Sequence, residues 1–227
     1  MLSINEINAY YGKLKVLHDL NLSVQQGERI GIFGHNGAGK TSLLKCCVGE
    51  LETKSGHIEW SGQRVVPQAV HLNTRMGIGF VPQGNNVFKD LSVKQNLNIA
   101  GLMHDPAFVA EIYQVFPILR ERQNQMAGTL SGGQQQMLGL GMAMMSKPRL
   151  LLLDEPTTGL APIIVKDVLN AVTRISDEQG MTLMMVEQNV QATLAYVDRA
   201  IVLKSGRIIF DDTSEQLRQE ESLWHLF

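Results

Sequence analysis

Residues 34–41, with the sequence GHNGAGKT, combine glycines, a lysine and a threonine in a spacing suited to binding phosphate. The segment matches the pattern G-x-x-x-x-G-K-[ST], with Gly34, Gly39, Lys40 and Thr41 at the fixed positions. Successive backbone N–H groups and a helix N-terminus bind phosphate oxygens. We therefore expect Lys40 to reach the β- and γ-phosphates of a nucleotide and the Thr41 hydroxyl to bind Mg²⁺. The residues of this loop expected to contact nucleotide are Gly34, His35, Asn36, Gly37, Ala38, Gly39, Lys40, Thr41 and Ser42.

Two carboxylates follow a run of four leucines in LLLLDEP, residues 150–156. Such a run predicts a buried strand, which would deliver Asp154 to the water shell of the metal. Glu155 points differently because side chains alternate along a strand, and we interpret it as the general base that polarises the attacking water. Taken alone, Asp-Glu after a strand could instead cap a helix. Phosphoryl transfer needs a positioning loop, a metal and a group that orients the nucleophile, and these residues supply all three.

A second glycine turn occurs in TLSGGQQQM, residues 129–137, where Ser131, Gly132 and Gly133 open a predicted helix. One nucleotide cannot use both turns from one side unless the intervening helices fold back over it.

The elements that position these residues alternate between strands and helices, which predicts a mostly parallel α/β sheet. Residues 28–34 and 182–188 read as buried strands, and hairpins are expected at Ser61-Gly62 and Ser205-Gly206. A helix is expected from about Lys40 to Val48. Residues 85–147 read as helices inserted between the two halves of the core, 1–84 and 148–227. Helices are expected within them at 93–103, 107–119 and 131–147, and further helices at 163–175 and 214–227. The methionines of this middle region, Met137, Met142, Met144 and Met145, are expected to pack in the core.

Composition and simple sequence patterns argue against nucleic-acid binding, a disulfide and a membrane-spanning segment. The 227-residue chain has a net charge of −2 and no cluster of basic residues, so nothing favours nucleic-acid binding. Cys46 and Cys47 are neighbours on a predicted helix and point apart, which indicates two reduced thiols rather than a disulfide. The sequence has no signal-peptide pattern and no apolar run that spans a bilayer, so a membrane role would require a partner.

The order GHNGAGKT, LSGGQ and LLLLDEP resembles the ATP-binding subunits of ABC transporters over essentially the whole chain. The resemblance implies a nucleotide-binding core with an N-terminal antiparallel β subdomain and an inserted helical subdomain. It also implies ATP and Mg²⁺ as cofactors. The implied partners are a second ATPase subunit, identical to this chain or different from it, polytopic permease subunits and, indirectly, an external binding protein. In the head-to-tail pair that the resemblance implies, each Ser131–Gly133 turn closes over the γ-phosphate bound by the other copy. The chain would then lie at the cytoplasmic face of the membrane. Further residues match family motifs. Tyr11, or its neighbour Tyr10, would stack on adenine, and Gln83 would touch Mg²⁺. Residues Ser131 to Gln134 belong to the family's signature motif, and residues 157–162 occupy the loop where two copies touch.

Two positions depart from the family pattern. Ala161 replaces an aspartate, and Gln188 stands where the family has a switch histidine. A glutamine amide can still donate a hydrogen bond to a phosphate oxygen, but it carries no positive charge. The ATP-binding subunits of branched-chain amino acid importers show similar departures at both positions. The sequences around Tyr11 and Gln83 also resemble those of urea and short-chain amide importers. Such subunits pair with a second ATPase that retains the histidine, which suggests two unequal sites.

Three alternatives share part of these motifs. A soluble ABC ATPase acting on ribosomes or DNA ends would be expected to have two ATPase domains or a long coiled coil. A nucleotide-binding regulator without catalysis is disfavoured by the presence of Lys40, Thr41, Asp154 and Glu155. An exporter subunit for lipid or polysaccharide is disfavoured only by the local sequence of residues 127–137 and 157–190. The transported substrate would be recognised by the membrane subunits and any external binding protein, and not by this chain.

Overall fold

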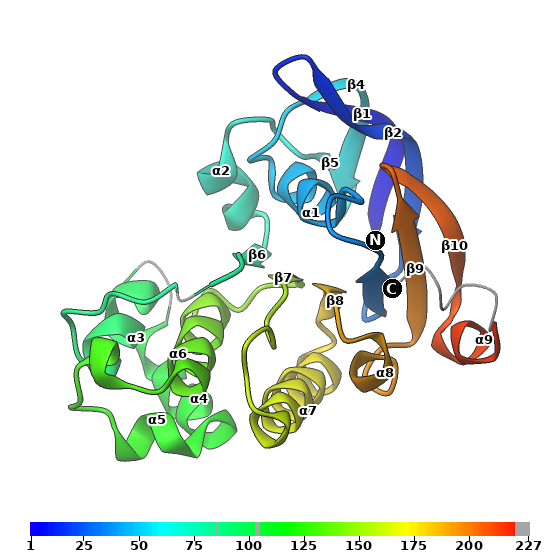
Figure 1. The fold of residues 1–227 in the computed structure, drawn as a ribbon. Helices are drawn as coiled ribbons and strands as arrows, with labels where there is room; N and C mark the ends of the chain where they lie inside the picture. The colour runs from blue at the N-terminus through cyan, green and yellow to red at the C-terminus, as the bar shows by residue number, and fades with distance from the viewer. Residues whose placement is uncertain (85, 103–104, 221–227) are drawn as a thin grey trace.

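A computed structural model describes residues 1–84, 86–102 and 105–220, and its centre is a six-stranded sheet (Figure 1). Its strands lie side by side in the order β10-β9-β3-β8-β7-β6, and only the pairing of β10 with β9 is antiparallel. The expectation of a mostly parallel sheet is therefore confirmed. The strands are β3 (Arg29–Phe33), β6 (Ile78–Val81), β7 (Leu150–Asp154), β8 (Thr182–Val186), β9 (Arg199–Lys204) and β10 (Arg207–Thr213).

A second, antiparallel sheet has the order β2-β1-β4-β5 and covers one side of the first helix, α1 (Lys40–Val48). Its strands are β1 (Leu2–Tyr11), β2 (Leu14–Val24), β4 (Thr53–Trp60) and β5 (Gln63–Arg64). The expected turns at 61–62 and 205–206 both join antiparallel strands. Helix α1 begins and ends where the sequence predicts, since Gly49 follows it in the left-handed conformation that ends helices. A short helix, α2 (Val70–Arg75), had no sequence prediction.

The inserted region is helical, as expected, but one of its predicted helices is interrupted. The helix predicted over 107–119 is split, because Phe116 adopts φ −121° and ψ 78° before Pro117. Proline disfavours a helical conformation at the residue before it, yet it fits the first turn of a new helix. The elements here are α3 (Val93–Gly101), the 3-10 helix η1 (Pro106–Phe108), α4 (Val109–Val115), α5 (Pro117–Glu121), the 3-10 helix η2 (Ala127–Thr129) and α6 (Gly132–Met144).

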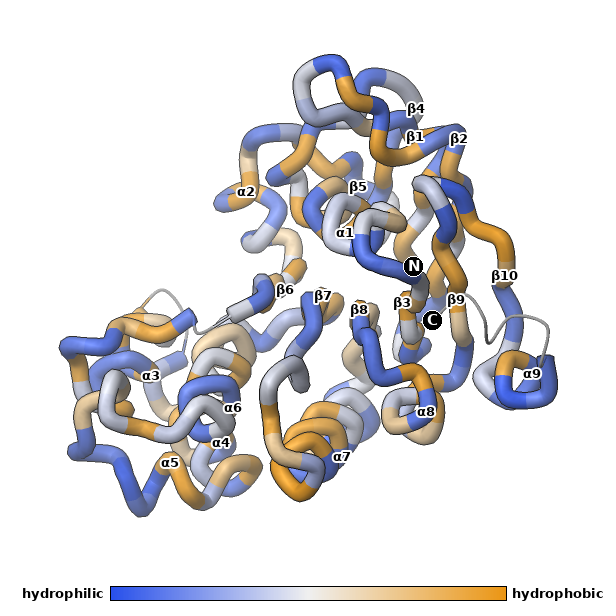
Figure 2. Tube along the Cα trace, viewed as in Figure 1, coloured by the Kyte–Doolittle hydropathy of each residue, from blue (hydrophilic) through white to orange (hydrophobic). Residues whose placement is uncertain are grey.

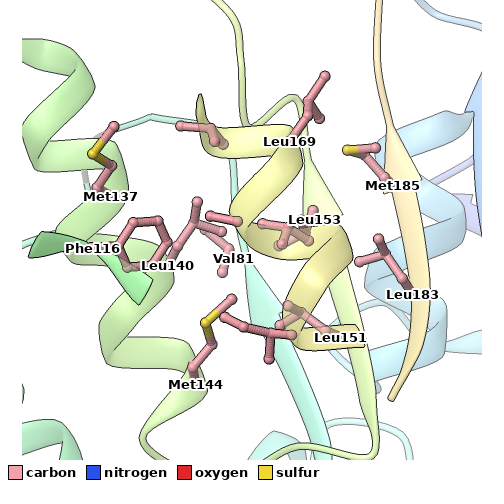
Figure 3. Packing of buried hydrophobic residues seen from close by; sticks show 14 of the residues in the cluster. Val81, Phe116, Met137, Leu140, Met144, Leu151, Leu153, Leu169, Leu183 and Met185 are labelled. Carbon is pink, nitrogen blue, oxygen red and sulfur yellow. The ribbon is translucent and has the colours of Figure 1, made fainter. Parts of the chain in front are cut away.

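Helix α6 ties the inserted region to the central sheet. Figure 3 shows Met137, Leu140 and Met144 of α6 facing the side of the sheet that carries Leu151 and Leu153. The long helix α7 (Pro162–Gln179) packs on the same core. The prediction that the methionines pack in the core is confirmed, since Met137, Met144 and Met145 are buried and the partly buried Met142 packs against the same core.

Two further short helices are α8 (Val190–Thr193), which follows β8, and α9 (Ser214–Gln219), which follows β10. The helix predicted over 214–227 is therefore found up to residue 219, and residues 221–227 lie outside the described residues. None of the helices in the described part of the chain has the length and apolarity needed to cross a bilayer.

The alternation of side chains along β7 positions the first candidate site residue. Leu150 and Leu152 belong to the core shared with α1, whereas Leu151 and Leu153 belong to the core shared with α6 and α7. Asp154 continues the first series, so its carboxylate emerges on the side of α1. In Figure 2 the segments that leave β7 and β8 are coloured hydrophilic directly after the apolar strands.

Candidate functional site

The loop between β3 and α1 requires glycine at two of its fixed positions. Gly34 has φ 135° and Gly39 has φ 104°, both in the region that residues with a side chain rarely adopt. A Cβ atom at Gly34 would lie 2.2 Å from the carbonyl oxygen of Leu203. Helix α1 has no side-chain cap at Gly39, so the N–H groups of its first turn remain available as donors to an anion.

Lys40 lies inside this loop rather than extending into solvent. Its Nζ donates to the carbonyl oxygens of Gly34 at 2.6 Å and His35 at 3.1 Å. Burial lowers the pKa of Lys40, while the carboxylates of Glu155 and Asp154 act in the opposite direction. The ammonium group therefore lies against the glycine loop and within electrostatic reach of the two carboxylates.

Thr41 and Asp154 form the pair expected at a magnesium site. The Thr41 hydroxyl donates to Asp154 Oδ1 at 3.1 Å, and Asp154 is buried. Burial raises the pKa of Asp154, and the negative charge of Glu155 raises it further. Two hard oxygen donors next to a phosphate-binding loop fit Mg²⁺, which takes few protein ligands and shares the rest of its shell with water and phosphates. A cation here would also offset the mutual repulsion of the two carboxylates.

Glu155 is turned away from the strand pattern by its backbone. Its φ of 50° is in the left-handed region, which is unfavourable for glutamate. Its N–H still donates to Val186 O at 2.9 Å, so the change of direction occurs at the last link between β7 and β8. Conformations of this kind persist where the surroundings enforce them and cluster at functional sites.

Three side chains from different segments converge on the Glu155 carboxylate. Gln83 Nε2, after β6, donates to Oε2 at 2.7 Å, and Thr158 Oγ1 donates to the same atom at 3.1 Å. Gln188 Nε2, after β8, donates to both oxygens, at 2.8 Å and 2.9 Å. The structure thus brings together Gln83, Glu155 and Gln188, which the sequence predicted as site residues from three separate motifs.

A cavity of about 480 Å³ joins this cluster to the phosphate-binding loop. Tyr11 lines it and is half exposed, whereas the neighbouring Tyr10 has the ammonium of Lys54 4.8 Å from its ring centre. The geometry therefore favours Tyr11 for stacking on a base. The other lining residues are Leu14, Val16, Asn36, Gly37, Gly39, Lys40, Thr41, Ser42, Gln83, Glu155 and Gln188. Gly34, His35 and Ala38, also predicted as contacts, shape the loop without lining the cavity.

The second glycine turn lies elsewhere in the same chain. Ser131 and Gln134 line a larger cavity, of about 550 Å³ between α5, α6 and α7, which shares no lining residue with the first. Within α6 these two residues cap the helix, since Ser131 Oγ accepts from Gln134 N at 3.4 Å and Gln134 Oε1 accepts from Ser131 N at 3.1 Å. One chain therefore does not present both turns to one cavity.

The two glycines of this turn have different surroundings. A Cβ at Gly133 would lie 2.7 Å from Cγ2 of Ile164 in α7, so this glycine permits the contact between α6 and α7. A Cβ at Gly132 would have no atom within 4 Å. Gly132 is open to an approaching group, as a second phosphate cradle requires.

Sequence reasoning missed two residues beside the site. Thr158 contacts Glu155, and Glu187 is a buried carboxylate between Thr157 and Gln188. Burial raises the pKa of Glu187 to about 7, despite hydrogen bonds that favour its charged form. An acidic residue directly after a run of five buried strand residues was the available signal for Glu187.

A comparison with known protein families identifies the family to which the chain is similar. The model of the ABC transporter family matches residues 17–158, a segment that includes the phosphate-binding loop, the second glycine turn and both carboxylates.

Two curated relatives cover nearly the whole chain. A high-affinity branched-chain amino acid transport ATP-binding protein of Pseudomonas aeruginosa is 42% identical over 221 residues, which are 96% of this chain and 94% of that protein. A probable branched-chain amino acid transport ATP-binding protein of Archaeoglobus fulgidus is 36% identical over 97% of this chain and 95% of its own length.

A solved structure shows the same arrangement of elements. The ADP conformation of an ATP-binding cassette from an ABC transporter superposes with a TM-score of 0.88 and 25% identity, covering 100% of this chain and 96% of that one. The match extends across both sheets and the inserted helices.

Proposed function

The chain belongs to the ABC transporter family as an ATP-binding subunit, and from that premise we propose that it hydrolyses ATP with Mg²⁺ to drive the uptake of branched-chain amino acids. The observation that carries the catalytic part is the convergence of Gln83, Thr158 and Gln188 on the Glu155 carboxylate, within reach of the phosphate-binding loop. Both curated relatives described above support the substrate class.

The residues divide the chemical work. Backbone N–H groups of the loop and the Lys40 ammonium bind the β- and γ-phosphates, and Tyr11 stacks on the base. Thr41 and Asp154 would hold Mg²⁺, with Gln83, which lines the same cavity as Thr41, as a further candidate ligand, and the cation would neutralise charge on the phosphates. Glu155 accepts a proton from the attacking water.

Gln188 occupies the position of the family's switch histidine. Its amide donates to both oxygens of Glu155 and thereby fixes the direction in which the carboxylate can accept a proton. The same amide reaches the cavity, where it can donate to a γ-phosphate oxygen. Because it carries no charge, we expect a site built on Gln188 to differ in rate from a site built on histidine.

Two chains complete each site. The turn Ser131–Gly133 and the phosphate-binding loop belong to separate cavities of one chain, so a second ATPase subunit arranged head-to-tail supplies the missing turn. Binding of ATP closes the pair, and hydrolysis with product release reopens it. Permease subunits that dock near Gln83 convert this movement into alternating access, and they place the chain at the cytoplasmic face of the membrane.

The test is co-purification of this chain from its native membranes in mild detergent, followed by mass spectrometry. Recovery of two polytopic membrane proteins with a second ATPase is the expected result. Stimulation of the ATPase rate by leucine, isoleucine or valine in the presence of the external binding protein would identify the substrate class, and stimulation by urea or amides would reassign it. Recovery of ribosomes or only soluble proteins would refute the transport role.

A further inference from the structure

Glu187 is a buried carboxylate with no part in the chemistry described above. It is 1% exposed and directly follows β8, where its N–H donates to Ile32 O of β3 at 3.3 Å. It does not line the cavity at the phosphate-binding loop. It lines a different cavity, of about 380 Å³, between the loop after β7 and the segment that leads into α8.

Both oxygens of Glu187 are engaged by backbone amides. Oε1 accepts from Thr157 N at 2.9 Å, and Oε2 accepts from Gln188 N at 3.3 Å. Thr157 belongs to the turn that leaves β7, whereas Gln188 follows β8. A single side chain therefore links the two segments that carry Glu155 and Gln188.

These contacts close a ring. The chain connects Glu155 to Thr157, a hydrogen bond connects Thr157 to Glu187, the peptide bond connects Glu187 to Gln188, and the Gln188 amide returns to Glu155 at 2.8 Å. Gln188 is consequently held at both ends, by Glu187 at its backbone and by Glu155 at its side chain.

The N–H groups of Thr157 and Gln188 require two acceptor atoms, one for each N–H. In its ionised form Glu187 offers acceptors only, whereas a glutamine at position 187 would present an NH₂ group to one of the amides. An apolar residue would leave the buried Thr157 N–H without a partner. Burial and the nearby Glu155 both disfavour a negative charge at position 187. Packing alone would therefore favour an uncharged side chain here rather than a carboxylate.

We propose that Glu187 is a positioning residue that fixes Gln188 against Glu155 for the reaction, through its hydrogen bonds to the amides of Thr157 and Gln188. The role rests on the proposed ATP hydrolysis. A misplacement of the Gln188 amide by about 1 Å can lower turnover by about 100-fold, since catalytic groups act within narrow limits of distance and direction.

The kinetic test compares Glu187→Gln with Gln188→Ala and with the double variant in the assembled transporter. We expect Glu187→Gln to lower kcat about 10- to 100-fold, with the dissociation constant for a fluorescent ATP analogue changed less than about 3-fold because Glu187 lies outside the nucleotide cavity. The double variant should be no slower than Gln188→Ala, since both changes disable the same contact. Glu187→Asp, which keeps two acceptors, should recover part of the loss. Glu178→Gln removes a carboxylate that is 63% exposed on α7 and serves as the matched control.

Multiplying losses in the double variant, or wild-type turnover in Glu187→Gln, would overturn the proposal. Hydrogen exchange of the full chain provides a second measurement that needs no activity. The amides of Thr157 and Gln188 should exchange faster in Glu187→Gln than in wild type, and unchanged protection would also overturn it. A wild-type assembly without ATPase activity would instead refute the proposed function, and exchange would then decide alone whether Glu187 holds the ring together.

Discussion

Replacing Glu155 by glutamine tests the centre of the proposed mechanism. The amide has nearly the same volume as the carboxylate but cannot accept the proton of the attacking water. It also supplies one acceptor oxygen where Gln83, Thr158 and Gln188 now share two. The perturbation therefore removes the base and loosens its neighbours, without opening a cavity.

The size of the effect follows from these contacts. Loss of a positioned general base costs about 10²- to 10⁴-fold in rate. Gln188 donates to both oxygens and would face an NH₂ group in one orientation, so we expect a loss near the middle of that range or above it, at about 10³-fold or more. Nucleotide affinity should change by less than about 3-fold, because the phosphates are bound by the loop and Lys40 rather than by a carboxylate.

The assay is steady-state ATP hydrolysis by the assembled transporter, alongside titration with a fluorescent ATP analogue. Melting of the variant should occur at or above the wild-type temperature, since removing the Glu155 charge relieves a repulsion that raises the pKa of the buried Asp154. Glu178→Gln is again the control. Turnover within about 5-fold of wild type would show that Glu155 is not the base and would refute the mechanism.

Three further predictions follow from the geometry. Lys40→Ala should weaken ATP binding by about 10- to 100-fold, the worth of a charge-assisted hydrogen bond to phosphate, and retained tight binding of the fluorescent analogue would contradict the placement of the ammonium. Gln188→His should change the steady-state rate and add a pH dependence near the imidazole pKa of about 6.5, and an unchanged rate and pH profile would show that Gln188 does not limit the reaction. Because the pKa of Glu187 is raised in the fold from 4.5 to about 7, the folded state binds the extra proton between these values, so the free energy of unfolding should fall as pH rises through that window, by on the order of 3 kcal/mol. Urea unfolding of the full chain between pH 5 and 8 measures this slope, and Glu187→Gln should flatten it; a variant with the wild-type slope would assign it to another group.

Much of the site could be predicted because its residues sit in local patterns. The run of four leucines predicted the burial of β7 and the position of Asp154 at its end, and the glycine spacing predicted the loop before α1. These features depend on side-chain period and on backbone conformations that only glycine adopts freely, and both can be read from adjacent residues.

The parts that could not be predicted depend on contacts between distant segments. The side chain of Glu155 departs from the alternation of the strand because its φ is positive, and none of the neighbouring residue types requires that conformation. The link from Glu187 to Thr157 joins residues 30 positions apart and becomes visible only when β7 and β8 lie side by side. The break before Pro117 was readable in principle, but apolar spacing across it suggested a continuous helix.

The two neighbouring glycines of the α6 turn should have different evolutionary histories. Gly133 is constrained by Ile164 of the same chain, so a larger residue at 133 is tolerable only together with a smaller one at 164, and the two positions should covary among relatives. A Cβ at Gly132 would meet no atom within 4 Å beyond its chain neighbours and its own helix backbone, so no contact within this chain limits the size of the residue at 132. In the proposed head-to-tail pair, the residues that limit position 132 would belong to the facing subunit, so compensation for a change at Gly132 would arise on the surface of that subunit.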